Sequence, residues 1–289
     1  MDQLVRLTST SHPAAAVAPI KPFLRWAGSK RKQLPVLSRQ LALPYARYIE
    51  PFAGSACLFF QVQPPTAVLG DKNAELIEVY RYVRDNPVRL HRRLVAIPRN
   101  ERTYYRWRRL NVRELDTDTR ALRFLYLNRN CFNGIYRTNE QGDFNVPMGN
   151  NIGDFLSRNE LDRCSRALQG VQLIDGDFED TLAHVARGDF VYLDPPFAAS
   201  SRRIFREYDK KPFSTDDVPR LTRQLRRIAR LGANFLVSYA DCKEARGLAD
   251  EWHSRKLKVR RHIAGFVGHR THAYEWLISN RAIREIDEA

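Results

Sequence analysis

The sequence predicts an α/β protein in which a parallel β-sheet is interrupted by a mostly helical, basic insertion. The first observation is an apolar stretch at 48–50 that runs into small residues at 51–55 and a helical start at Cys57. The second is a buried-type strand at 67–71, followed by a helical pattern over 74–83 with one apolar face. Repeated strand, turn and helix are typical of a parallel sheet covered by helices.

The third observation is the break in this pattern between residues 85 and 169. That stretch is dense in Arg, Tyr, Trp and Asn and lacks alternating strands. Helical patterns and then a polar, glycine-containing stretch cover 87–95, 101–113, 119–130 and 130–153. Sheet-like segments return at 171–174, 190–193, 234–238 and 274–278, with a basic amphipathic helix over 215–231.

This order of elements predicts the domains. Residues 21–84 and 170–289 form one discontinuous α/β domain, and residues 85–169 form the insertion. Residues 1–20 are rich in Ser, Thr, Ala and Pro, so we expect a flexible tail. The charged residues 280–289 are expected to form the C-terminal end.

The charge of the chain favours a polyanionic partner. Among 289 residues, 48 are Lys or Arg and 33 are Asp or Glu, which gives a formal net charge of +15. The basic residues are spread along the chain, as on a folded protein that contacts nucleic acid. A membrane surface or an acidic protein is the alternative. The cysteines form no C-x-x-C pair, so we expect reduced thiols and an intracellular protein without a secretory signal or membrane span.

A candidate ligand loop spans 50–56, which reads Glu-Pro-Phe-Ala-Gly-Ser-Ala. Small residues where a strand turns into a helix allow the backbone to approach a ligand closely. Asp71, at the end of the next strand, is placed to bind a pair of ribose hydroxyls. No G-x-G-x-x-G or Walker loop is present, and an ordinary tight turn is the alternative for this segment.

A second candidate is Asp194-Pro195-Pro196-Phe197, directly after the apolar strand 190–193. Two prolines fix the backbone and remove neighbouring N–H groups. The Asp194 carboxylate and a proline carbonyl could then accept two hydrogen bonds from an exocyclic amino group. The Phe197 ring could stack on a base. The alternative is a strand terminator followed by an extended loop.

Two further segments carry polar candidates. In 23–30 (Phe-Leu-Arg-Trp-Ala-Gly-Ser-Lys), Lys30 could reach Asp194 or a carboxylate of a ligand, although a solvated lysine at a helix start is the alternative. Residues 127–149 contain Asn133-Gly134, a strong hairpin signal. We expect a hairpin there that presents side chains able to read base edges in the major groove, or alternatively a solvated polar loop.

Together, in this order and spacing, the four segments resemble the Dam-type (D12 class) N6-adenine DNA methyltransferases. That family's pattern runs F-L-K-W-A-G-G-K, E-P-F-x-G-x-G, D-x-N-x-x-L-I, then L-N-R, N-G-x-x-R-x-N and G-x-F-N-V-P-F-G within an insertion, and finally D-P-P-Y. The third motif stands here as 71–77, Asp-Lys-Asn-Ala-Glu-Leu-Ile. The resemblance covers residues 21 to about 280 and implies a Rossmann-like class I methyltransferase sheet with an inserted target-recognition domain.

The resemblance also implies roles for matching residues. It implies S-adenosylmethionine as cofactor, without a metal, bound by Trp26, Lys30, Glu50, Phe52, Gly54, Ser55, Asp71, Asp177, Phe178 and Asp194. The implied catalytic residues are Asp194, Pro195, Pro196, Phe197 and Lys30. The implied DNA contacts are Arg129, Asn133, Ile135, Tyr136, Arg137, Asn139, Asn145 and Pro147. Phosphate contacts are expected from arginines at 102–113, 202, 203, 223–230, 260, 261 and 270.

Some positions depart from the family pattern without removing a catalytic group. Ser29 and Ala56 replace glycines, Phe197 replaces the commoner Tyr, and Met148 replaces Phe. The hairpin matches in frame but differs in content, so its target sequence does not follow from the family. His269 and His272 have no carboxylate or cysteine at ligand spacing beside them, so a phosphate-contacting loop is expected there and no metal site.

The function expected from this resemblance is site-specific transfer of a methyl group to adenine N6 in duplex DNA after base flipping. We expect a cytoplasmic protein that associates with the nucleoid. A homodimer on a palindromic site, a cognate restriction endonuclease and a solitary regulatory role all stay open. A catalytically inactive DNA-binding regulator and an RNA methyltransferase are the competing hypotheses.

Overall fold

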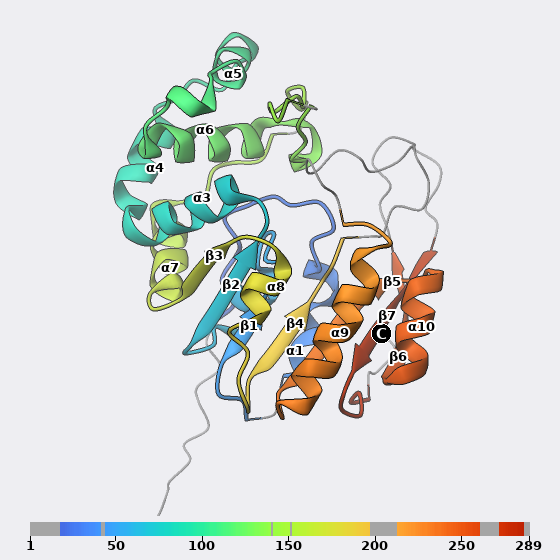
Figure 1. The fold of residues 1–289 in the computed structure, drawn as a ribbon. Helices are drawn as coiled ribbons and strands as arrows, with labels where there is room; N and C mark the ends of the chain where they lie inside the picture. The colour runs from blue at the N-terminus through green and yellow to red at the C-terminus, as the bar shows by residue number, and fades with distance from the viewer. Residues whose placement is uncertain are drawn as a thin grey trace, which may run out of the picture.

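The computed structural model describes residues 18–41, 44–139, 141–150, 152–196, 213–260 and 272–285. Within these residues a seven-stranded sheet has the order β3-β2-β1-β4-β5-β7-β6 (Figure 1). Its strands are β1 (Tyr48–Glu50), β2 (Ala67–Asp71), β3 (Gln172–Asp175), β4 (Phe190–Leu193), β5 (Asn234–Ala240), β6 (His253–Arg260) and β7 (His272–Ser279). The first five are parallel, and β7 pairs antiparallel with both β5 and β6. The predicted α/β sheet is confirmed.

The strand order creates a switch point between β1 and β4. From β1 the chain builds outward through β2 and β3 on one side, and it later builds β4 and β5 on the other. Crossover connections therefore leave in opposite directions at β1 and β4, and open α/β sheets form their ligand-binding crevice at the carboxyl ends of the strands at such a point. Glu50 ends β1 and Asp194 directly follows β4.

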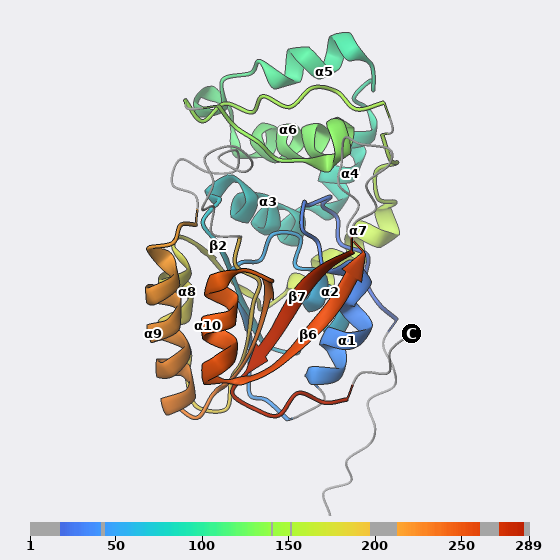
Figure 2. The same cartoon turned by 90° about the vertical axis from the view of Figure 1, so that its right-hand side faces the viewer.

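Two layers of helices cover the sheet, as parallel strands buried on both faces require. On one face lie α8 (Phe178–Leu182), α9 (Asp217–Arg230) and α10 (Lys243–Glu251), which pack on the alternate strand residues Ile49, Val191 and Val237 (Figure 2). On the other face, α1 (Leu34–Gln40), α2 (Cys57–Val62) and α3 (Ala74–Asp85) pack on Tyr48, Tyr192 and Leu236. None of the described helices combines the length and apolarity needed to cross a lipid bilayer.

Most of the segment between α3 and β3 lies above the carboxyl ends of the strands, whereas its last helix, which leads into β3, lies lower, beside the sheet (Figures 1 and 2). Its elements are α4 (Pro87–Val95), α5 (Glu101–Arg108), α6 (Thr117–Asn130) and α7 (Arg158–Leu168), with short 3₁₀ turns η2 (Val112–Glu114) and η3 (Phe132–Gly134). Residues Ala121 to Asn130 of α6 are all buried. Helix α6 and the sheet share one hydrophobic cluster that includes Tyr126 and Tyr192. The 85–169 boundary of a separate recognition domain therefore stays a prediction.

The hairpin of the insertion differs from the expected one. Asn133-Gly134 lies in η3 at the end of α6, where Asn133 has φ +54° and Gly134 has φ +67°. The two arms instead pair at Thr138 and Phe144. The turn is closed by Asn139, whose backbone N–H donates to the Asp143 carbonyl at 2.9 Å. The Asn-Gly signal thus marks the base of the hairpin, because both residues adopt the left-handed backbone in the short turn that follows α6.

Candidate active site

A carboxylate after β4 is held from two sides. Asp194 Oδ1 lies 2.9 Å from Lys30 Nζ and accepts a hydrogen bond from Ser238 Oγ at 3.3 Å. The Ser238 hydroxyl is in turn 2.9 Å from the hydroxyl of Tyr192. Among the described residues no side chain hydrogen-bonds Asp194 Oδ2, and the side chain is 23% exposed. One oxygen is therefore anchored while the other can accept hydrogen bonds from a ligand.

The charge state of Asp194 depends on these neighbours. Burial raises the pKa of Asp194 above its ordinary value, and Glu275 raises it further. Lys30 and the Ser238 hydrogen bond act in the opposite direction. Since an ionised carboxylate is the better acceptor, Lys30 favours the form of Asp194 that can bind an amino group.

Lys30 also contacts a residue that the sequence analysis missed. Its Nζ lies 3.3 Å from Glu275 Oε2 in β7, and both side chains are buried. Burial alone would lower the pKa of Lys30, but Asp194 and Glu275 outweigh it and raise that pKa. The available signal was strand alternation: Glu275 shares a face of its strand with the buried Leu277, so a charged residue there needs a partner.

The loop after β1 is shaped by backbone contacts. Gly54 has φ +48°, and its N–H donates to Asp71 Oδ2 at 2.9 Å, while Tyr80 donates its hydroxyl to the Gly54 carbonyl at 2.9 Å. A Cβ at Gly54 would lie 2.8 Å from Trp26 Cδ1. The loop therefore requires glycine at this position, for its backbone angle and for the space beside Trp26.

Two more carboxylates face this crevice. Glu50 is buried and accepts a hydrogen bond from Tyr48 at 2.8 Å. Burial raises the pKa of Glu50 well above its ordinary value, and the charges of Asp194 and Asp71 add to that rise. Asp71 Oδ1 accepts the N–H of Asn73 at 2.9 Å. A crevice with this many desolvated acids suits a ligand that carries positive charge.

The remaining expected cofactor residues lie at the neighbouring strand ends. Phe52 stacks on Phe178, with ring centroids 5.5 Å apart. Asp177 caps the short helix α8 and its Oδ1 accepts a hydrogen bond from Arg220 at 2.6 Å. Ser55 is buried, and its hydroxyl is 3.5 Å from that of Ser29.

The proline pair continues from Asp194 with Pro195 buried and Pro196 exposed. Phe197 lies outside the described residues, as do the expected phosphate contacts at 202, 203, 261 and 270 and the side chain of Arg260. The arginines at 223–230 lie toward the C-terminal end of α9, which leads into the amino end of β5, so they occupy the edge of the sheet opposite to Asp194.

The predicted DNA contacts of the hairpin differ in exposure: most are exposed or partly exposed, and one is buried. Arg137 is half-buried, and its Nε donates to Asn145 Oδ1 at 2.7 Å, which fixes the direction of the guanidinium group. Asn133 and Pro147 are exposed, and Ile135 and Asn139 are partly exposed. Tyr136 is buried and stacks on Trp26 at 5.7 Å, so it connects the hairpin to the loop at Gly54. Phe132, which the sequence analysis did not select, is 43% exposed beside them.

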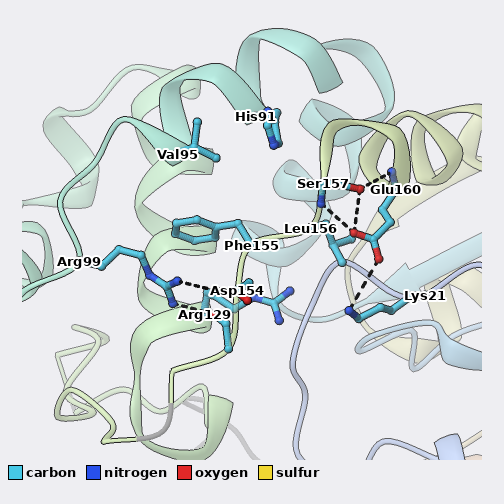
Figure 3. A pocket seen from close by; sticks show the side chains of 11 residues that line it. Lys21, His91, Val95, Arg99, Arg129, Asp154, Phe155, Leu156, Ser157 and Glu160 are labelled. Carbon is cyan, nitrogen blue, oxygen red and sulfur yellow. Dashed lines mark hydrogen bonds and ion pairs between the residues drawn. The ribbon is translucent and has the colours of Figure 1, made fainter.

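Arg129 lies in a different place from the other predicted DNA contacts. It lines a cavity of about 540 Å³ between α4, the end of α6 and the start of α7, together with Arg99 and Phe155 (Figure 3). Its Nη2 donates to the Phe23 carbonyl at 3.2 Å. Burial, Arg25, Arg31 and Arg99 lower the pKa of Arg129 to about 10. Its position fits a contact between the insertion and the N-terminal segment.

Comparisons with known proteins agree with this arrangement. A model of the D12 class N6 adenine-specific DNA methyltransferases matches residues 26–263. The type II methyltransferase M1.LlaDCHI of Lactococcus lactis subsp. cremoris is 33% identical over 256 residues, which cover 84% of this chain and 89% of that protein. The type II methyltransferase M.MjaIII of Methanocaldococcus jannaschii is 31% identical over 287 residues, which cover 90% of this chain and 99% of that protein. The DNA adenine methylase of Escherichia coli K12 is 30% identical over 266 residues, which cover 89% of this chain and 94% of that protein.

Proposed function

The chain belongs to the D12 class of N6 adenine-specific DNA methyltransferases, and from this premise we propose how its residues carry out the reaction. As a member of this class it is a site-specific DNA adenine methyltransferase. The proposal is that S-adenosylmethionine binds in the crevice between β1 and β4, and that Asp194 and Pro195 hold the amino group of an adenine extruded from duplex DNA.

The donor groups of the crevice fit the cofactor. Its sulfonium and ammonium groups are cationic, and Glu50, Asp71 and Asp194 surround the crevice with carboxylates. The bare backbone at Gly54 allows close approach, and Asp71, at the end of β2, binds the Gly54 N–H and so lies beside the loop where ribose hydroxyls would bind. When bound, S-adenosylmethionine supplies an electrophilic methyl group. Trp26, Phe52, Ser55, Asp177 and Phe178 are proposed to line the remainder of this site.

The observation that supports the target-base role is the asymmetry of Asp194. Lys30 and Ser238 both contact Oδ1, so Oδ2 is the oxygen proposed to accept a hydrogen bond from the base. An adenine N6 amino group has two hydrogens, one for Oδ2 and one for the carbonyl that follows in Pro195. Accepting both would align the nitrogen lone pair with the methyl group, so positioning and electrostatics provide the catalysis. Pro196 keeps this backbone rigid, and Phe197 is proposed to stack on the base.

DNA is proposed to approach from the hairpin. In-line attack needs the adenine outside the base stack, which supports base flipping. Arg137, oriented by Asn145, can bind a guanine edge in a bidentate manner. Asn133, Ile135, Asn139 and Pro147 would flank it, and the exposed Phe132 can insert beside the vacated position. Exposed arginines near α5 would contact phosphates.

The biological setting is part of the same proposal. Duplex DNA is the substrate partner, and we place the enzyme on chromosomal DNA in the cytoplasm, in the nucleoid. Two relatives are named type II methyltransferases, which supports a restriction endonuclease with the same target as a partner. Two copies could act on the two strands of a palindromic site. The intact Lys30–Asp194 pair disfavours the inactive-regulator alternative.

The experiment that tests this function is the identity of the product. Purified protein, methyl-labelled S-adenosylmethionine and unmethylated genomic DNA are incubated, and the DNA is digested to nucleosides and examined by mass spectrometry. We expect label in N6-methyldeoxyadenosine, and long-read sequencing should place it in one short motif. Label in a methylated cytosine, or in RNA when both nucleic acids compete, would contradict the proposal.

A further inference from the structure

Glu275 lies outside the parallel part of the sheet yet reaches the site of Asp194. It belongs to β7, which pairs antiparallel with β5, and its partner in the register is Ala240. Ser238, two residues earlier in β5, contacts Asp194. Lys30 therefore spans from a carboxylate after β4 to one in β7, over the strand that carries Ser238.

Glu275 binds both ends of one short turn. Its Oε2 accepts a hydrogen bond from Gln33 Nε2 at 2.7 Å and lies 3.3 Å from Lys30 Nζ. Lys30 precedes the 3₁₀ turn η1 (Arg31–Gln33), and Gln33 ends it, with its N–H donating to the Lys30 carbonyl at 2.8 Å. These contacts hold the backbone and the ammonium group of Lys30 in one position.

A lysine ammonium on a flexible four-carbon stem has no preferred direction of its own. With Asp194 as its one ion-pair partner, the ammonium group could approach Oδ1 from more than one direction, although Ser238 also binds that oxygen. The second carboxylate supplies a fixed point on the far side, so the ammonium can only approach Asp194 from one direction. Because Oδ1 faces that direction, the orientation of Oδ2 is set as well.

We propose that Glu275 is a positioning residue for methyl transfer: it acts through Lys30 to orient the Asp194 carboxylate toward the amino group of the target adenine. This inference rests on the function proposed above for Asp194. A purely structural role, in which Glu275 only ties β7 to η1, is the competing explanation. The two explanations differ in their effect on kcat, on KM and on the pH profile.

The test starts with Glu275→Gln, which keeps the size and the hydrogen-bonding reach of the side chain and removes its charge. We expect kcat to fall about 10- to 100-fold, since misplacement of a reacting group by about 1 Å has an effect of this size. The KM for DNA and for S-adenosylmethionine should change less than about 3-fold, because the binding surfaces are intact. The matched control is Glu251→Gln, which breaks the surface pair with Arg226 at 2.7 Å and should leave kcat unchanged.

A double-mutant comparison separates the two explanations. If Glu275 acts through Lys30, Glu275→Gln should lower kcat no further in a Lys30→Gln background than Lys30→Gln does alone. Loss of the same size in both backgrounds would show an effect independent of Lys30 and would overturn the inference. A folded Glu275→Gln variant with wild-type kcat would overturn it directly.

The pH profile reports whether the charge of Glu275 acts at Asp194, whereas the double-mutant comparison reports whether it acts through Lys30. Activity needs ionised Asp194, so kcat falls as pH drops through the pKa of that group. The described charged and titratable groups around Asp194 are Lys30, Glu275, Glu50, Tyr192 and Cys57. Removing the charge of Glu275 should move the acid limb to lower pH, because that charge favours protonated Asp194. An unmoved limb would argue for the structural explanation.

Two further measurements keep the outcomes distinct. Should Glu275→Gln fail to fold, Glu275→Asp retains the charge with a shorter reach, and wild-type kcat in that variant would overturn the inference. The energetic coupling between Lys30 and Glu275 can also be measured from urea unfolding without cofactor of the wild type, Lys30→Gln, Glu275→Gln and the double variant. Free energies of unfolding that simply add would contradict the inference. If the wild-type enzyme methylates a base other than adenine, the proposed function fails while this coupling is still measurable.

Discussion

Substituting Gly54 by alanine should destabilise the protein more than the backbone angle alone explains. A non-glycine residue in the left-handed region, where Gly54 lies at φ +48°, costs about 1–2 kcal/mol. The new Cβ would also lie 2.8 Å from Trp26 Cδ1 and 2.9 Å from Nε1. The Trp26 ring cannot easily move, because it stacks on Tyr136 and Phe124. Overpacking of this kind costs about 1–3 kcal/mol, so we expect a total of about 2–5 kcal/mol.

Gly170→Ala is the matched control for this prediction. Gly170 has φ +73°, and no atom lies within 4 Å of a Cβ built there. Its substitution should therefore cost only the backbone term, about 1–2 kcal/mol. Urea unfolding of both variants gives the difference, which isolates the contact with Trp26. Calorimetry should also show weaker binding of S-adenosylmethionine by Gly54→Ala and unchanged binding by Gly170→Ala. Equal destabilisation of the two variants would refute this account of the loop.

Three other changes have defined outcomes. Ala56→Gly should raise the free energy of unfolding by up to about 1 kcal/mol. The left-handed backbone at φ +46° disfavours alanine by about 1–2 kcal/mol, and the greater entropy of glycine in the unfolded chain offsets part of that gain. A lower free energy of unfolding in urea would contradict this prediction. Ser238→Ala removes a hydrogen bond that lowers the pKa of Asp194, so the acid limb of kcat should move to higher pH, and a shift to lower pH would contradict this sign. Arg137→Ala should weaken discrimination at one base pair of the target by about 1–3 kcal/mol, whereas replacing the exposed Arg102 should weaken binding of all sequences alike; genomic methylation maps and salt-dependent binding distinguish the two.

The elements with simple apolar patterns could be predicted from the sequence. The strands at 48–50, 67–71 and 190–193 and the helix at 87–95 have the predicted bounds. Short runs of apolar residues with turn-forming neighbours determine these elements locally. The strand order, and with it the crevice between Glu50 and Asp194, depends on which strands pair, and local patterns in the sequence do not determine that pairing.

Elements with mixed patterns were missed for identifiable reasons. β6 (His253–Arg260) alternates apolar residues with Lys and Arg, as an exposed edge strand does, and this obscures its strand character. Helix α7 carries a capping box between Ser157 and Glu160, a signal that was present in the sequence and not used. The Asn-Gly signal correctly indicated a tight turn, but this turn lies at the base of the hairpin, and the signal does not show which turn of the segment joins the two arms.

The site was predicted in part. The structure brings Lys30 and Asp194 together at 2.9 Å, and Asp194 is one of the two partners expected for this lysine from its segment. Glu275 and Ser238 could not be assigned from their neighbours in the sequence, because their roles arise from pairing between β4, β5 and β7. Arg129 was predicted to contact DNA with the hairpin but is buried beside Phe23, and its role stays a prediction.

The central claim is that Asp194, held by Lys30 and Ser238, binds the amino group that receives the methyl group. It is tested most directly by the single-turnover rate constant of Asp194→Asn, measured with saturating DNA and S-adenosylmethionine, beside the exposed Asp250→Asn as control. We expect a loss of about 100- to 1,000-fold or more for Asp194→Asn at saturation, with the dissociation constant for DNA within about 3-fold of wild type. A rate constant within about tenfold of wild type would contradict the claim, because the reaction would then proceed without this carboxylate.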